Sequence, residues 1–88
     1  MDKKKLAVLA ALEAAPAGLL KADFREATSR EVSAHTVQEE QLDPLLSSGH
    51  IAATAEASTD GRIKGMVDRF TLTDAGKAAL AQCRAGAL

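Results

Sequence analysis

The chain has 88 residues, of which 47% are hydrophobic and 2% aromatic, and its formal net charge is −1. This length supports one domain, with a small aliphatic core around Phe24 and Phe70. The near-neutral charge excludes a general attraction to nucleic acid or to anionic membranes, so binding to either depends on how the charges are distributed.

Side chains suited to catalysis or metal binding are sparse. His35 and His50 have no cysteine or carboxylate at metal-ligand spacing, and Cys83 has no evident base as a partner. We interpret these residues as an exposed helix residue, a residue at the start of a strand and a small apolar helix residue, respectively. We therefore expect no enzymatic activity, no metal site and no cofactor.

The number of cysteines indicates the redox environment of the protein. A single cysteine rules out an internal disulfide and is typical of a reducing environment. No stretch of the sequence approaches the roughly 20 apolar residues that cross a bilayer. We expect a cytoplasmic protein that does not bind membranes.

Two helices are predicted before residue 30. Asp2 is a suitable N-cap for a helix from residue 3 to about residue 15, which Pro16 then ends. Residues 18–20 could form a short extended piece. A second helix is expected at about residues 20–27, with Leu20, Phe24 and Ala27 on one face.

Residues 33–48 carry the clearest helical pattern. Ser33 is the expected N-cap, and an inward stripe follows in which Gln41 is the one polar member: Ala34, Val37, Gln41 and Leu45. Gly49 is placed where a left-handed C-terminal cap needs glycine. Pro44 predicts either a kink in one helix or a fresh turn capped by Asp43, and we favour the kinked helix.

A hairpin and a last helix complete the chain. Residues 50–55 and 66–72 alternate as strands do, and Asp60-Gly61 between them is a strong turn signal. Thr73 is the expected N-cap of a helix that reaches about residue 85, with Asp74 in its first turn.

Two segments carry a resemblance to a known superfamily. HTVQEEQLDPLLSSGHI looks like a third helix leading into a wing strand, and DRFTLTDAGKAAL contains the aromatic-x-Leu-Thr-x-x-Gly pattern of MarR-like and PadR-like bacterial regulators. With the order of elements, these segments make nearly the whole chain similar to the winged helix-turn-helix superfamily. The expected fold is α+β and mostly helical, with a three-helix core, a two-stranded wing and a C-terminal helix.

The resemblance implies one winged-helix domain over residues 1–88 that regulates transcription. Its helix-turn-helix would span about residues 20–48, its wing about residues 50–72, and its C-terminal helix about residues 73–85. The third helix would enter the major groove of duplex DNA, and the C-terminal helix would contribute to a homodimer. The residues that map onto DNA contact are Arg30 in the turn, Ser33, His35, Thr36 and Gln38 with Glu39 beside them on the third helix, and Arg62 and Lys64 at the wing tip.

The charges of the third helix depart from the family pattern. Residues 31–50 contain four acidic residues and no Lys or Arg, although Arg is the commonest reader of guanine. Phosphate attraction would have to come from cations outside this helix: Lys3, Lys4, Lys5, Lys21, Arg25, Arg30, Arg62, Lys64 and Arg69. The alternative hypothesis is a winged-helix protein-interaction module that docks on a basic partner through its acidic third helix.

Overall fold

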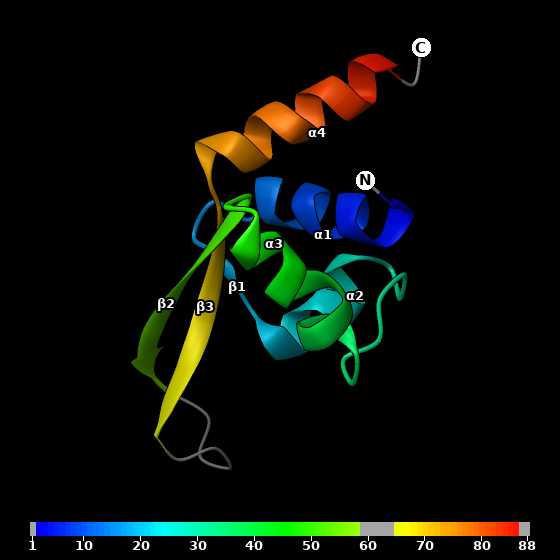
Figure 1. Cartoon of the computed structure of the whole chain (residues 1–88). Coiled ribbons are helices and arrows are strands. Elements are labelled where there is room, and N and C mark those ends of the chain that lie inside the picture. The colour runs from blue at the N-terminus through cyan, green and yellow to red at the C-terminus, as the bar shows by residue number, and fades with distance from the viewer. Residues whose placement is uncertain (1, 59–64, 87–88) are drawn as a thin grey trace.

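The protein is a small α+β domain in which helices pack on a three-stranded antiparallel sheet (Figure 1). The computed structural model describes residues 2–58 and 65–86. The elements in chain order are α1 (Lys3–Glu13), β1 (Leu19–Leu20), the 3-10 turn η1 (Lys21–Asp23), α2 (Phe24–Ala27), the π-helical turn η2 (Gln38–Leu42), α3 (Asp43–Ser47), β2 (Ile51–Ala57), β3 (Met66–Leu72) and α4 (Asp74–Gly86).

The first helix begins as its sequence predicts. A carboxylate oxygen of Asp2 accepts a hydrogen bond from the backbone N–H of Lys5 at 2.8 Å, and the other accepts from Lys5 Nζ at 2.9 Å. The hydrogen bond from the Lys5 backbone N–H is the main cause of the lowered pKa of Asp2. The helix ends at Glu13, slightly before the predicted residue 15.

The second predicted helix forms as the 3-10 turn η1 followed by α2, and Phe24 is buried as expected, but one residue of the predicted inner face is wrong. Ala27, expected to face inward, is exposed, and the next residue, Thr28, is buried instead. The Thr28 hydroxyl donates to the carbonyl of Phe24 at 2.6 Å and accepts from the backbone N–H of Val32 at 3.3 Å. Because this hydroxyl bonds both ends of the turn after α2, it stabilises that turn from inside the protein.

The third helix comprises η2 and α3 and runs through Pro44 without a break, as favoured from the sequence. Regular helical structure starts at Val37, later than the predicted residue 33, after turns at residues 34–36. The π turn precedes Pro44, which cannot donate a backbone hydrogen bond and would crowd the carbonyl four residues earlier. The helix ends with Gly49 at φ +80°, where the N–H groups of Gly49 and His50 bond to the carbonyls of Leu46 and Leu45.

The sheet has the strand order β1-β3-β2, so a short third strand joins the two strands of the predicted hairpin. Leu19 pairs with Phe70, and Ile51 pairs with Leu72. Residues 52–55 of β2 are all exposed, because the β2–β3 hairpin extends away from the helices (Figure 1).

The last helix is anchored at its first turn. Thr73 Oγ1 accepts from the backbone N–H of Gly76 at 3.1 Å, as expected for an N-cap, and donates to the carbonyl of Gly49 at 2.6 Å. From there α4 lies along α1, on the side away from α2 (Figure 1). Gly76 and Leu80 are its buried residues among those described.

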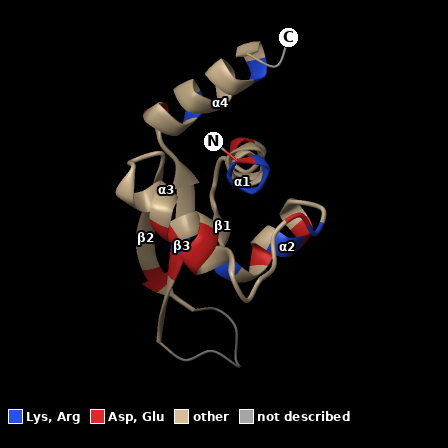
Figure 2. Cartoon of the chain, turned by 45° about the vertical axis from the view of Figure 1, so that its right-hand side comes forward, with Lys and Arg blue, Asp and Glu red and all other residues tan. Residues whose placement is uncertain are grey.

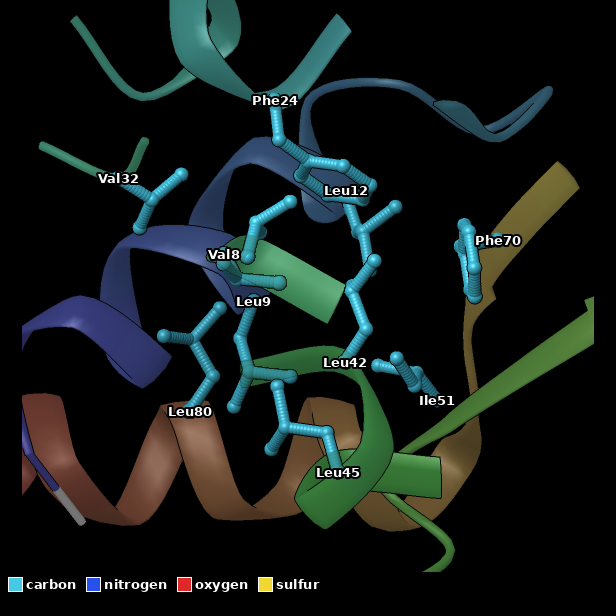
Figure 3. Packing of buried hydrophobic residues seen from close by; sticks show 11 residues of the cluster. Val8, Leu9, Leu12, Phe24, Val32, Leu42, Leu45, Ile51, Phe70 and Leu80 are labelled. Atoms are coloured by element: carbon cyan, nitrogen blue, oxygen red, sulfur yellow. The ribbon is translucent and has the colours of Figure 1, made fainter. Parts of the chain in front are cut away.

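The core draws one or more side chains from every helix and both long strands (Figure 3). The rings of Phe24 and Phe70 meet edge to face with centroids 6.0 Å apart, which joins α2 to the sheet. The buried cluster consists of Val8, Leu9, Leu12, Phe24, Val32, Val37, Leu42, Leu45, Ile51, Phe70 and Leu80.

Candidate nucleic-acid interface

The start of the third helix presents small polar side chains to solvent. Ser33, His35 and Thr36 are exposed, and Gln38 is half-buried. Ser33 Oγ accepts from the backbone N–H of His35 at 3.2 Å, and the Ser33 carbonyl accepts from Val37 N–H at 2.9 Å. Ser33 therefore stabilises the turn at residues 34–36 and is not the N-cap of the third helix as predicted, because that helix begins only at Val37, which makes no side-chain cap.

Arg30 is placed by a tight turn before this segment. Ser29 and Arg30 have φ values of +53° and +65°, in the left-handed region that non-glycine residues rarely occupy. The backbone N–H of Arg30 donates to the carbonyl of Arg25 at 2.7 Å. The turn thus returns the chain beside α2, and the two arginines line the same hollow.

This hollow brings three cations to the start of the third helix. It has a volume of about 530 Å³, and its lining includes Lys4 of α1, Arg25 of α2 and Arg30, together with Ser33 and His35. None of the three cations forms an ion pair with another described residue. Their side chains can bind an external anion without first leaving a partner. We name Lys4, Arg25 and Arg30 the cation cluster.

Other cations considered from the sequence are engaged within the protein. Lys3 Nζ lies 3.0 Å from Glu31 Oε1, and Lys5 Nζ lies 2.9 Å from Asp2 Oδ2, so both lysines form ion pairs. Arg69 donates from Nε to Glu56 at 2.5 Å and from a terminal nitrogen to the carbonyl of Gly18 at 3.2 Å. Arg69 therefore ties β3 to β2 and to the start of β1. Because its guanidinium is engaged in these bonds, Arg69 is not among the proposed phosphate contacts.

Lys21 lines a separate groove of about 340 Å³. This groove runs between η1, the start of the third helix and β3, and its lining includes Lys21, Gln38, Val67 and Asp68. Lys21 has no ion pair within the described part of the chain. Unpaired cations therefore lie near the start of the third helix in two separate depressions.

The acidic residues gather further along the same helix. Glu39, Glu40 and Asp43 are exposed, and none contacts a cation among residues 2–58 and 65–86. Figure 2 shows acidic segments on the third helix and basic segments on α1 and α2 to one side of it. Position along the helix thus separates a neutral polar start from an acidic middle.

A side-chain hydrogen bond links these two parts. Gln38 Nε2 donates to Asp43 Oδ1 at 2.6 Å across the π turn. On the inner face, Gln41 is 3% exposed and its Oε1 has no hydrogen-bond partner in the described structure, in keeping with its place as the polar exception of the inward stripe.

The wing tip was the second predicted contact region. Arg62 and Lys64 lie outside the described residues, so the structure bears on neither of them. The strands that lead toward them, β2 and β3, are paired in register from Ile51 with Leu72 to Ala57 with Met66.

Each residue of the cation cluster can be identified in the sequence, but their proximity cannot. Lys4, Arg25 and Arg30 come from three segments, and their convergence depends on how α1 packs against α2 and on the left-handed turn at residues 29–30. The available signal was the separation of charge along the chain, with a net charge of +2 over residues 1–30 and −4 over residues 31–50.

Residues 2–58 and 65–86 contain no group of three or more His, Cys, Asp or Glu side chains that could hold a metal ion. Over those residues, every helix is too short or too polar to cross a bilayer. The chain matches no protein-family model, no curated protein and no solved structure.

Proposed function

We propose that this chain is a winged helix-turn-helix domain that binds duplex DNA as a homodimer and regulates transcription. The order of elements, the hairpin after the third helix and the short strand β1 beside β3 support this assignment. The fold alone does not define a ligand, so the proposal depends on the surface.

The observation that carries the proposal is the cation cluster. Lys4, Arg25 and Arg30 line one hollow with Ser33 and His35, so phosphate-binding and base-facing side chains share one region. Phosphate contacts position a protein on DNA, and polar side chains on a helix can then reach base edges. Lys21, Arg62 and Lys64 extend the proposed phosphate contacts, and Ser33, His35, Thr36 and Gln38 are the proposed base-facing residues.

A titration against random-sequence duplex at several salt concentrations tests the proposal. We expect binding that weakens steeply with salt, because bound cations displace condensed counterions. Arg25→Ala and Arg30→Ala should each reduce the log–log salt slope by about 1. Arg62→Ala with Lys64→Ala should reduce it further if the wing contacts the backbone.

Lys77→Ala is the matched control for these variants. Lys77 is an exposed lysine of α4 that lacks an ion pair in the described structure and lies outside the cation cluster. Its removal takes away the same charge and should leave the salt slope nearly unchanged. The proposal is wrong if no duplex binds at low salt with micromolar protein, or if Lys77→Ala weakens binding as much as Arg25→Ala does.

The exposed acidic residues favour a second candidate, a module that docks on a basic protein surface. Glu39 and Glu40 are adjacent on the third helix and unpaired among the described residues. The double variant Glu39→Lys with Glu40→Lys distinguishes the two functions, because it should change the affinity for DNA and the affinity for a basic protein in opposite directions. It should strengthen DNA binding by removing repulsion from phosphates, whereas it should abolish binding to a cationic partner.

A further inference from the structure

The third helix holds one side chain, Gln38, in a defined orientation. Gln38 Nε2 donates to Asp43 Oδ1 at 2.6 Å, while the Gln38 carbonyl accepts from the backbone N–H of Asp43. Two hydrogen bonds therefore join the same pair of residues, one through the side chains and one through the backbone.

This pairing depends on the π turn. In a regular α-helix each residue advances by roughly 100°, so residues five apart point in directions that differ by roughly 140°. The π turn η2 has its hydrogen bond between residues five apart, which brings residue 43 over residue 38. Pro44, directly after this pair, disfavours a regular α-helical turn at this point.

The chemistry of the pair decides which way the amide faces. An ionised carboxylate only accepts hydrogen bonds, so Asp43 requires the Nε2 side of the Gln38 amide. The amide oxygen and the second N–H of Nε2 are then left for a ligand. Turning the amide over would place its oxygen against the carboxylate, which costs a charge-assisted hydrogen bond and adds repulsion.

The free groups of Gln38 match one DNA base. In the major groove adenine presents a donor at N6 and an acceptor at N7, which pair with the oxygen and the N–H of a glutamine amide. Guanine presents two acceptors, N7 and O6, so the amide oxygen of Gln38 would meet an acceptor. A free glutamine can rotate to relieve this conflict, but one held by Asp43 cannot do so without losing its partner.

We propose that Gln38 selects adenine in the bound duplex and that Asp43 is a positioning residue that gives Gln38 this selectivity. The inference rests on the proposed function, which it deepens by naming a base. Gln38 also lines the groove that it shares with Lys21 and β3, so an unpaired cation suited to a neighbouring phosphate lies in the same groove. Asp43 thereby places an acidic residue on a DNA-facing helix without contacting DNA itself.

The test selects a preferred duplex from a random pool and then measures affinity for that duplex and its single-base variants. We expect wild type to prefer adenine over guanine by roughly tenfold at one position. Gln38→Ala should remove that preference and leave the salt slope unchanged. Asp43→Ala should reduce the preference to about twofold or less, because the amide can then rotate.

Two further variants separate positioning from charge. Glu40→Ala removes the same charge from an exposed neighbour that lacks this hydrogen bond, so it should raise affinity for every duplex and keep the adenine preference. Asp43→Asn keeps the size of the side chain, but its amide can donate as well as accept and so can pair with either end of the Gln38 amide, which should weaken the preference. Circular dichroism of each variant establishes that the third helix is retained.

The outcomes are distinguishable. A chain that binds no duplex at low salt overturns the proposed function and the adenine assignment with it. Duplex binding in which Gln38→Ala and wild type share one base preference overturns the adenine assignment alone. If Asp43→Ala and Glu40→Ala behave alike at every base, Asp43 has no positioning role.

Discussion

Gly76 decides how closely α4 approaches the sheet. A Cβ atom at this position would collide with the carbonyl oxygen of His50 and lie 2.6 Å from Leu72 Cδ1. The same stretch of backbone is joined by the hydrogen bond from Thr73 N–H to the His50 carbonyl, so it cannot move away freely. The glycine in the Leu-Thr-x-x-Gly pattern therefore has a packing reason in this chain.

Gly76→Ala should destabilise the protein by about 2 kcal/mol or more, because the added methyl group must displace backbone. Urea unfolding followed by circular dichroism measures the change in unfolding free energy. Gly86→Ala, near the end of the same helix with no atom near the added methyl group, should be neutral or slightly stabilising. Equal effects of the two changes would show that Gly76 has no special packing role.

Replacing the buried Gln41 by an apolar residue should stabilise the protein. Its buried Oε1 lacks a hydrogen-bond partner in the described structure, and a buried unsatisfied polar atom costs free energy that an apolar atom does not. Gln41→Met, which has a similar volume, should raise the unfolding free energy by about 1 kcal/mol. Gln82→Met at an exposed site of α4 should change it by less than about 0.5 kcal/mol, and an equal gain at both sites would contradict this account.

Beyond its anchored first turn, α4 contributes one described side chain, Leu80, to the buried cluster. Leu80 is 3% exposed and packs in the buried cluster, whereas most side chains around it on α4 are exposed. The second link is the surface ion pair between Arg84 and Glu13 at 2.8 Å. Exposed ion pairs contribute little free energy because water screens them.

Leu80→Ala should therefore lower the unfolding free energy by about 2–4 kcal/mol. Glu13→Gln, which removes the ion pair, should lower it by less than about 1 kcal/mol. Thermal unfolding with hydrogen exchange along α4 measures both effects. A larger loss from Glu13→Gln than from Leu80→Ala would mean that charge, and not packing, holds α4 in place.

The helices also show which features can be predicted from local sequence patterns and which cannot. Asp2 and Thr73 cap the helices that they were predicted to cap, because capping needs only a side-chain oxygen and the next few backbone N–H groups. Ser33 caps only a turn, since the third helix begins only at Val37. On the inner face of α2, Phe24 is buried as predicted, but Thr28 is buried in place of Ala27 because the Thr28 hydroxyl is satisfied by backbone groups that only the folded turn brings to it. Periodicity counts Thr as polar and cannot detect this.

For the whole molecule, the charge distribution limits the affinity for DNA that we expect of a single copy of the chain. Four cations near the third helix, Lys4, Lys21, Arg25 and Arg30, lack an ion pair in the described part of the chain, and four acidic residues lie within residues 31–50. A homodimer would double the phosphate contacts, which is why the proposed function includes one. The groove between α1 and α4, about 550 Å³ and lined by Leu6, Ala10 and Cys83 among others, is the proposed contact face.

Sedimentation velocity should show a dimer at micromolar concentration. Cys83→Glu places a charge in this groove and should dissociate the dimer, whereas Ala81→Glu, an exposed α4 position outside the groove lining, should not. Circular dichroism checks that both variants remain folded. A monomer at every concentration would remove the homodimer and much of the support for DNA binding.

The sequence by itself determined the element order, the caps of the first and last helices, the glycine at the end of the third helix and the presence of a hairpin. These features depend on side chains and backbone groups a few residues apart, so periodicity and capping rules reach them. The sequence did not decide whether β1 forms, because two residues are too few to show a strand pattern. The strand is defined by the pairing of Leu19 and Leu20 with Phe70 and Arg69.

Only the tertiary structure decided which charged residues are available to a ligand. Arg69 is held by Glu56 and by the carbonyl of Gly18, which is 51 residues away in sequence. Lys4, Arg25 and Arg30 come together from three segments, and Gln38 meets Asp43 because the helix adopts a π turn before Pro44. Each of these outcomes depends on packing or on a local departure from regular helix geometry, and neither can be read from residue types in order.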